Sequence, residues 1–224
     1  MSVPKVKVCG MREIENIREV ARLPLDMMGF IFYPRSPRVV KDAEKLSGML
    51  RESVLPKRIS RVGVFVNAAI EEVLSKTHAF DLDYIQLHGG ESPSYCAELQ
   101  NIWRSTGLKK AGIIKAFSVG EEMDFDICSP FEHYCSHFLF DTKTPEYGGS
   151  GKSFPWELLA DYKGKVPFLL SGGIGPDAVT ALRHFAHPLW AGIDVNSRFE
   201  TAPGLKDTVA LEQFIGYLNA EVGE

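Results

Sequence analysis

The stretch Pro167-Phe168-Leu169-Leu170-Ser171-Gly172-Gly173-Ile174-Gly175-Pro176 decides the fold, because an apolar run leads directly into a glycine-rich turn. A short continuous apolar run is typical of a strand that is covered on both faces, as in a parallel sheet. The glycines let backbone amides approach an anion closely, and the helix that follows adds its N-terminal dipole. The stretch predicts a strand–loop–helix unit with a phosphate site in its loop; the alternative is a glycine turn that binds nothing.

The same unit repeats along the chain, with apolar or β-branched runs separated by segments in which apolar residues recur at helical spacing. These runs are Val6–Cys9, Met28–Tyr33, Ile59–Val66, Tyr84–Leu87, Ile113–Phe117, Phe138–Phe140, Pro167–Leu170 and Gly192–Val195. Parallel strands with right-handed crossovers can form an open sheet or a closed barrel. Eight repeats in 224 residues, without a linker, favour closure. We therefore expect an α/β fold: a single (β/α)₈ TIM barrel in one domain, residues 1–224.

The helical segments differ in how clearly the sequence marks them. Ser92 is an N-cap candidate, and Pro93 then occupies the first helical position. Residues 119–135, in contrast, show poor helical periodicity and contain Pro130. The barrel is therefore expected to have a short or irregular fifth helix.

Composition excludes several classes of protein and binding partner. Hydrophobic residues make up 45% and charged residues 24%, which is typical of a globular chain and excludes disorder. The net charge of −4, without a Lys/Arg run, gives no support for nucleic-acid binding. No apolar stretch approaches the ~20 residues that cross a bilayer, and no signal region precedes the first strand. We expect a cytoplasmic chain without a membrane partner, with its four cysteines reduced.

The reactive groups of such a barrel gather where the strands end. The residues at these positions include Cys9, Arg35, Arg38, Asn67, His88, Lys115, Asp141, Asp194, Asn196 and Ser197. We expect them to surround one mouth, with a phosphate bound by the loops after the seventh and eighth strands. Cys9 has two interpretations: a small packing residue, or a reactive thiol whose thiolate a positive environment stabilises.

Two further segments bear on chemistry. A glycine-rich run at residues 142–152 follows Asp141, and we expect it to be mobile and to cover a bound substrate. It lacks the glycine spacing of a nucleotide-binding P-loop. The cluster Cys128, His133, Cys135 and His137 matches no paired Cys-x₂-Cys arrangement, so no metal site is predicted.

At the strand ends the chain closely resembles the phosphoribosylanthranilate isomerase family of tryptophan biosynthesis. The matching stretches are Lys7–Met11, Gly29–Arg38, Arg61–Asn67, Gln86–Gly89, Asp141–Phe154, Leu170–Ile174 and Pro203–Asp207. The resemblance implies an Amadori rearrangement of a small phosphorylated aminosugar, N-(5′-phosphoribosyl)anthranilate, to 1-(2-carboxyphenylamino)-1-deoxyribulose 5-phosphate. It implies no cofactor and no metal.

The resemblance also implies roles for individual residues. Asp141 matches the general acid that protonates the ribose ring oxygen, and Cys9 matches the general base that removes the proton from the sugar C2. Arg38 matches the cation that holds the anthranilate carboxylate, for which a planar guanidinium is suited; the alternative is a solvated surface arginine. His88 and Asp194 face the same mouth and are expected to contact the substrate.

The phosphate-binding turns match less completely. Gly172, Gly173, Asn196 and Ser197 correspond to them, largely through backbone amides. After the eighth strand the family usually reads Asp-Val-Ser-Ser-Gly-Val-Glu, whereas this chain has Asp194-Val195-Asn196-Ser197-Arg198-Phe199-Glu200. If the replaced glycine needs φ > 0, Arg198 is strained; otherwise it adds a positive charge near the phosphate.

Three functional hypotheses remain open on the sequence alone. The first is the isomerase that the resemblance implies. The second is a related isomerase for another amine-linked sugar phosphate, and the third is a sensor that binds a phosphoribosyl ligand without turnover, suggested by Asn196 and Arg198. The oligomeric state, monomer or homodimer, is not decided by the sequence.

Overall fold

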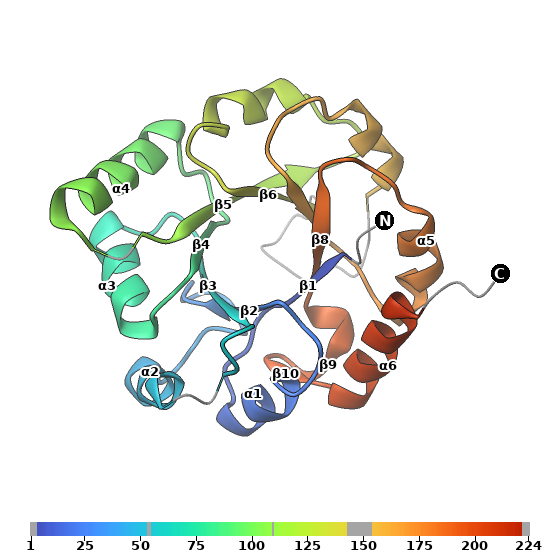
Figure 1. Ribbon diagram of the computed structural model, residues 1–224, viewed down its shortest axis with the longest axis horizontal. Helices are drawn as coiled ribbons and strands as arrows, with labels where there is room; N and C mark the ends of the chain where they lie inside the picture. Colours follow the sequence, from blue (N-terminus) through green and yellow to red (C-terminus); the bar gives the residue numbers. More distant parts are fainter. Residues whose placement is uncertain (1–3, 53–54, 109, 143–153, 221–224) are drawn as a thin grey trace.

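The strands form a closed barrel in the computed structural model, which describes residues 4–52, 55–108, 110–142 and 154–220 (Figure 1). Eight parallel strands follow one another in chain order, and the last pairs with the first. They are β1 (Lys5–Val8), β2 (Met27–Ile31), β3 (Ser60–Phe65), β4 (Tyr84–Leu87), β5 (Gly112–Val119), β6 (His137–Thr142), β7 (Phe168–Leu170) and β8 (Trp190–Val195). The predicted (β/α)₈ barrel is confirmed.

Helices connect the strands and form the outer ring of Figure 1. The α-helices are α1 (Ile14–Val20), α2 (Ala43–Arg51), α3 (Ile70–Phe80), α4 (Pro93–Thr106), α5 (Val179–His184) and α6 (Thr208–Asn219). The 3₁₀ helices are η1 (Phe125–Phe131), η2 (Trp156–Asp161), η3 (Pro176–Ala178) and η4 (Ser197–Phe199). A hairpin of β9 (Glu200–Ala202) and β10 (Leu205–Lys206) precedes α6.

Two expectations about the connections are confirmed, and a third feature was not anticipated. The Ser92 side chain accepts a hydrogen bond from the backbone of Tyr95 and so caps α4. The fifth connection is the 3₁₀ helix η1, which contains Pro130. The sixth connection, η2, is also a 3₁₀ helix rather than an α-helix.

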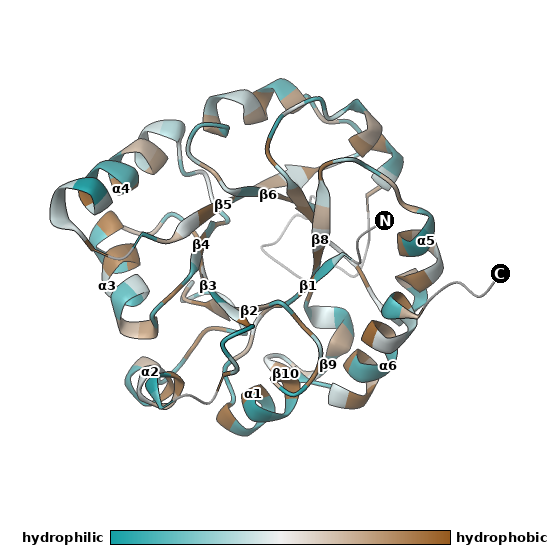
Figure 2. Cartoon of the chain, in the orientation of Figure 1, coloured by the Kyte–Doolittle hydropathy of each residue, from teal (hydrophilic) through white to brown (hydrophobic). Residues whose placement is uncertain are grey.

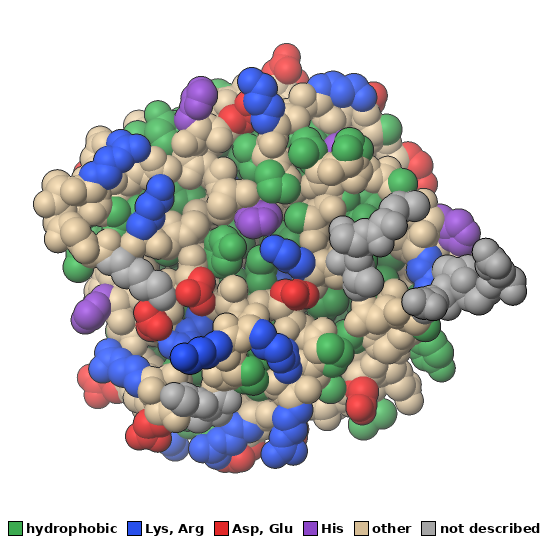
Figure 3. All heavy atoms as spheres, in the orientation of Figure 1, with side chains coloured by type: hydrophobic (Ala, Val, Ile, Leu, Met, Phe, Trp, Pro, Cys, Tyr) green, Lys and Arg blue, Asp and Glu red, His purple; other side chains and the backbone are tan. Residues whose placement is uncertain are grey.

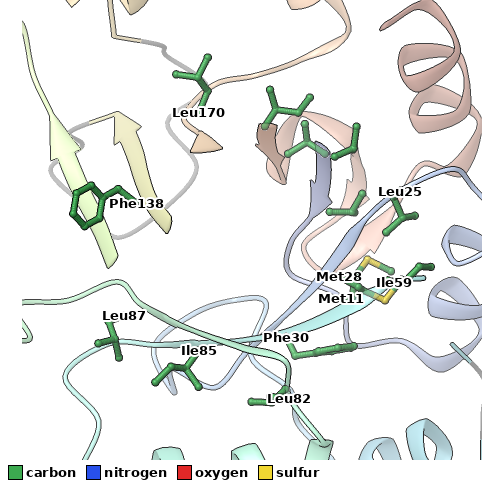
Figure 4. Close-up of a cluster of buried hydrophobic side chains, with 14 of the residues drawn as sticks. Met11, Leu25, Met28, Phe30, Ile59, Leu82, Ile85, Leu87, Phe138 and Leu170 are labelled. Carbon is green, nitrogen blue, oxygen red and sulfur yellow. The ribbon is translucent and has the colours of Figure 1, made fainter. Parts of the chain in front are cut away.

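Alternation along each strand divides the core into two parts. One set of side chains points outward to the helices, whose apolar faces turn toward the barrel (Figure 2). Figure 4 shows part of this outer layer, with Met28 and Phe30 from β2, Ile85 and Leu87 from β4, and Phe138 from β6. A smaller inner cluster comprises Met27, Val62, Ile114, Ala116, Leu139 and Leu169. The barrel interior is therefore packed, and the positions above this inner cluster are the ones that can form a site.

Charged side chains of both signs are interspersed on the face drawn in Figure 3. In the part of the chain that the structure describes, none of the helices has the length and apolar character needed to span a bilayer.

Candidate active site

Strand alternation directs four of the predicted site residues toward the barrel axis. Leu139 belongs to the inner cluster, so Asp141, two residues later on β6, lies on the same side. The same alternation turns Cys9 inward after Lys7, and His88 inward after Gln86, because Val8 and Leu87 belong to the outer layer. Asp194 lies between two outer-layer residues of β8. The sequence-based expectation of a shared mouth is thus met at four strands.

The thiol lies beside a buried ion pair on β1 and β8. Lys7 Nζ donates to Asp194 Oδ1 at 2.8 Å, and these two residues are register partners across the seam where the barrel closes. Lys7 is fully buried and Cys9 is 3% exposed. The sulfur also lies against the backbone of β2, where a Cβ at Gly29 would be only 2.8 Å from Cys9 Sγ. Glycine at position 29 therefore makes room for the thiol.

Burial and neighbouring charge act in opposite directions on this thiol. Burial raises the pKa of Cys9, the positive charges of Lys7 and Lys206 lower it, and the negative charge of Asp194 raises it, with a net increase. Burial lowers the pKa of Lys7, but Asp194 and Cys9 outweigh this effect and its pKa is raised. The ammonium therefore stays charged, and it is available to compensate a thiolate.

The carboxyl group of Asp141 belongs to a hydrogen-bonded row on β4 and β6. His88 Nε2 lies 3.2 Å from Asp141 Oδ2, and the other ring nitrogen, Nδ1, lies 2.8 Å from Gln86 Nε2. The backbone N–H of Thr142 donates to Asp141 Oδ1 at 2.9 Å. The His88 and Asp141 side chains are 27% and 23% exposed, so both can be reached from the mouth.

Asp194 links the two sides of the mouth. Burial raises the pKa of Asp194, the charge of Lys7 lowers it, and the charge of Asp141 raises it again. Asp194 therefore interacts electrostatically with both the Lys7 ammonium and the Asp141 carboxyl group. Because Asp194 is 6% exposed and already paired with Lys7, its predicted contact with the substrate stays a prediction.

Arg38 is held by a bidentate ion pair with the hairpin. Its Nε and Nη2 groups donate to the Glu200 carboxylate at 2.7 to 3.0 Å, and Lys206 Nζ donates to the same carboxylate at 2.6 Å. Burial raises the pKa of Glu200, but the hydrogen bonds and charges of Arg38 and Lys206 outweigh burial, so the pKa is lowered overall. Arg38 is thus a largely buried, fixed guanidinium and not a solvated surface arginine.

The turn after β7 has the backbone conformation that glycine favours. Gly172 and Gly173 have φ of 89° and 66°, and a Cβ at Gly172 would lie 2.1 Å from Thr142 Oγ1. Asn196 and Ser197 follow β8, and the Asn196 side chain accepts a hydrogen bond from Lys206 at 2.7 Å. The side chain of Asn196 is therefore engaged with Lys206, and its carbonyl accepts from Phe199 N–H, so its backbone N–H is the group for the predicted phosphate contact.

The two interpretations of Arg198 can now be separated. Within the described residues, the non-glycine positions with positive φ are Asn67 and Asp81, so Arg198 has no left-handed strain. Its guanidinium instead pairs with Asp177 at 3.0 Å and lies over Gly175, where a Cβ would be 2.7 Å from Arg198 Nε. Arg198 therefore places a positive charge beside the glycine turn and joins the loops after β7 and β8.

Some expectations from the sequence need correction or lie beyond the described residues. Lys115 does not belong to the mouth: it shares the outward side of β5 with Phe117, and its Nζ donates to Gly89 O at 2.7 Å and to Glu91 at 3.2 Å. The glycine-rich run, apart from Thr142 on β6, and with it the expected cover over the substrate, lies outside the described residues. Of the cysteines and histidines for which no metal site was predicted, Cys135 lies beside the Cys96 thiol, and His137 packs edge-on against Tyr84.

The sequence did not single out four residues of the site. These are Lys7, Gln86, Glu200 and Lys206. All four stood within the stretches that carry the family resemblance or the departure from it, which was the only signal for them. Their partners lie on other strands or on the hairpin, so no local pattern shows what they bind.

Comparisons with known proteins agree with this geometry. The family model described as N-(5'phosphoribosyl)anthranilate (PRA) isomerase matches residues 6–216. An N-(5'-phosphoribosyl)anthranilate isomerase from Phocaeicola vulgatus is 47% identical, over 97% of this chain and 98% of its own length. A crystal structure of phosphoribosyl anthranilate isomerase from Thermotoga maritima superimposes with a TM-score of 0.81 at 33% identity, covering 96% of this chain and 98% of that one.

A further solved structure carries a ligand. It is a phosphoribosyl anthranilate isomerase in complex with reduced 1-(o-carboxyphenylamino)-1-deoxyribulose 5-phosphate, and it superimposes with a TM-score of 0.78 at 29% identity, covering 96% of this chain and 98% of that one. The match of the family model over most of the chain and the extent of the identity decide the assignment. This chain belongs to the N-(5'-phosphoribosyl)anthranilate isomerase family.

Proposed function

We propose that the chain carries out its family's reaction, the isomerisation of N-(5′-phosphoribosyl)anthranilate, with Cys9 as the general base and Asp141 as the general acid. The observation that supports these roles is their placement: a buried thiol beside an ammonium, and a carboxyl group bonded to His88, on inward positions of one barrel mouth. Two groups in such different surroundings divide acid and base work between them.

The proposed reaction steps account for every proton. Asp141 gives its proton to the ribose ring oxygen, the bond from C1 to that oxygen breaks, and a Schiff base forms. The Cys9 thiolate then removes the proton from C2, and the electron pair moves to C1–C2 to give an enolamine. The enolamine gives its C2 hydroxyl proton to water and takes a proton from water at C1, which produces the aminoketose. A proton passing from Cys9 back to Asp141 through water resets the enzyme.

The ionisation of the thiol is the demanding part of this scheme. Burial raises the pKa of Cys9, while Lys7 and Lys206 oppose that effect. Lys7 is already paired with Asp194, so its ammonium is fixed in place before the substrate binds. Such a preorganised charge costs no rearrangement when negative charge develops on the sulfur.

The substrate's two anionic ends have separate binding groups in this proposal. Glu200 engages Nε and Nη2 of Arg38, which leaves Nη1 to donate to the anthranilate carboxylate. Gly172 and Gly173, with the backbone of Asn196 and Ser197, bind the phosphate through N–H groups. We further propose that residues 1–224 act as one domain in the cytoplasm, on this small phosphorylated substrate and without nucleic acid.

The direct test is turnover of the fluorescent aminoaldose by the purified chain. Cys9→Ser and Asp141→Asn should each lower kcat by about 10²- to 10⁴-fold, the usual contribution of a general acid or base. Cys128→Ser is the matched control, because Cys128 is also a buried thiol but packs in the outer layer. Unchanged turnover in both site variants would rule out the assigned roles.

The anthranilate end distinguishes this reaction from that of a related isomerase. Arg38→Ala should raise KM for N-(5′-phosphoribosyl)anthranilate, because the carboxylate loses its cation. An unchanged KM would show that Arg38 does not bind the anthranilate carboxylate.

A further inference from the structure

Gln86 is a polar residue at an inward position that packing alone would fill with an apolar one. It lies on β4, is 1% exposed, and its register partners on the neighbouring strands are Val64 and Ile114. Its Nε2 group lies 2.8 Å from His88 Nδ1, and its Oε1 atom is buried without a hydrogen-bond partner among the described residues. Burying an amide whose oxygen has no hydrogen-bond partner costs free energy. The presence of Gln86 at this position, and its bond to His88, therefore call for a functional explanation.

That bond fixes the state of the imidazole ring. Because Gln86 Nε2 donates, His88 Nδ1 must accept with a lone pair. The single ring proton then resides on Nε2, which faces Asp141 Oδ2 at 3.2 Å. A second ring proton, on Nδ1, would point directly at the amide N–H of Gln86. The arrangement therefore selects the neutral ring.

We propose that Gln86 is a positioning residue for the general acid: by donating to Nδ1 it keeps His88 neutral, so that a proton taken up by the His88–Asp141 pair resides on Asp141. The inference rests on the proposed function of Asp141. In solution an imidazole is more basic than a carboxylate, so an unassisted pair holding one extra proton is imidazolium and carboxylate. In that form Asp141 has no proton to give to the ring oxygen of the sugar.

The hydrogen bonds at Asp141 leave room for this proton. Thr142 N–H occupies one lone pair of Oδ1, and His88 Nε2–H occupies one lone pair of Oδ2. Each oxygen keeps a second lone pair, on which the acidic proton can point away from His88. His88 thus orients the carboxyl group instead of competing for its proton.

The charged groups around the pair are already matched with one another. Asp194 on β8 is paired with Lys7 on β1, beside Cys9. On the β5 side, Lys115 is paired with Glu91. The charge of Asp194 acts on both His88 and Asp141, and the ammonium of Lys7 at 2.8 Å compensates much of it. The donor group of Gln86, in direct contact with Nδ1, is the specific influence.

Two variants of the full chain separate this role from packing. Gln86→Met keeps the side-chain length but removes the donor, and should lower kcat about tenfold with little change in KM. Gln86→Glu is closest in shape but presents only acceptors to Nδ1, so it favours the imidazolium and should lower kcat about a hundredfold. A packing role predicts the reverse order, with the glutamate variant the better tolerated; that order would overturn the proposal.

Nitrogen-15 NMR of the His88 ring gives a second readout that does not depend on turnover. At pH 7.5 the wild-type ring should carry its proton on Nε2 only, whereas Gln86→Glu should carry protons on both nitrogens; His88→Asn identifies the signals. A wild-type ring with a proton on Nδ1 would contradict the proposal, even if Gln86→Glu fails to fold. If the wild-type chain shows no isomerase activity, the proposed function fails, while the NMR result still decides the state of His88.

Discussion

The two sides of the mouth differ in how their charges are arranged. The side that carries the proposed base is buried and charged: Cys9 is 3% exposed, and the positive charges of Lys7 and Lys206 act on it. The side that carries the proposed acid is partly exposed and has neutral hydrogen-bond donors: Asp141 is bonded to His88 and to a backbone N–H. Cations favour an ionised thiol, whereas neutral donors impose no such charge on a carboxyl group that must hold a proton. The difference accounts for the proposed division of roles.

The largest expected effect comes from breaking the ionic network on the base side. Glu200 is 4% exposed in its ion pair with Arg38, and Glu200→Gln leaves Arg38 and Lys206 buried without a counter-charge. We expect a loss of about 3–5 kcal/mol in the free energy of unfolding, measured by urea denaturation. Glu13→Gln, which removes an exposed pair with Arg12, is the control and should cost no more than about 1 kcal/mol.

The same variant should also change how the free energy of unfolding depends on pH. Burial raises the pKa of Glu200, but the hydrogen bonds from Arg38 and Lys206 outweigh it, so the pKa is lowered. A carboxyl group whose pKa is lowered in the folded state stabilises the fold at pH values above its pKa in the unfolded chain. This contribution is lost as the pH falls through the folded-state pKa. Glu200→Gln should therefore lose less stability on acidification than the wild type. An equal loss in the two proteins would show that Glu200 is not the group responsible.

At the Cys9 thiol itself we expect a smaller effect, on the pH at which the thiolate forms. Lys7→Met removes a cation that opposes the raised pKa of Cys9, so the thiolate forms at higher pH. The limb of the profile of kcat/KM against pH that reports the ionisation of Cys9 should move to higher pH, and activity near neutral pH should fall about tenfold. Alkylation of Cys9 followed against pH measures the same ionisation directly.

Lys115→Met is the matched control for Lys7→Met, because it also breaks a buried lysine–carboxylate pair. It lies on the outward side of β5, so it should reduce stability without moving the pH profile. If both variants move the profile equally, a general loss of structure explains the result and Lys7 has no specific role.

The smallest expected effect is at the phosphate end, which belongs to neither side of the comparison. Arg198→Gly restores the residue that the family usually has and removes a half-exposed charge beside Gly175. We expect KM to rise about fivefold, equivalent to about 1 kcal/mol, and kcat to stay constant. Arg183→Ala, an exposed arginine on α5, should leave both unchanged. A rise in KM only for Arg183→Ala would place the phosphate elsewhere.

The sequence was informative wherever structure depends on local pattern. The apolar run Tyr84–Leu87 is the strand β4 without any change of bounds, and the Ser92–Pro93 start of α4 was identified correctly. Pro130 correctly indicated an irregular fifth connection. In contrast, nothing in the sequence of η2 distinguished a 3₁₀ helix from an α-helix, because both place apolar residues at similar spacing.

The site was only half visible, because its pairs are made by barrel closure. Lys7 and Asp194 are 187 positions apart and meet only because β8 pairs with β1. Glu200, which accepts from both Arg38 and Lys206, lies on a hairpin that no strand pattern had predicted. Lys115 was misplaced for a related reason: being at the end of a strand does not say which side of the barrel a residue faces.

The most direct test of the central claim is a crystal structure of this chain with reduced 1-(o-carboxyphenylamino)-1-deoxyribulose 5-phosphate, the ligand of the related enzyme. We expect the sulfur of Cys9 and the carboxyl of Asp141 to lie on opposite sides of the sugar chain, with the phosphate at Gly172 and Gly173. A ligand bound with both groups on one side, or with its phosphate away from the glycine turn, would contradict it.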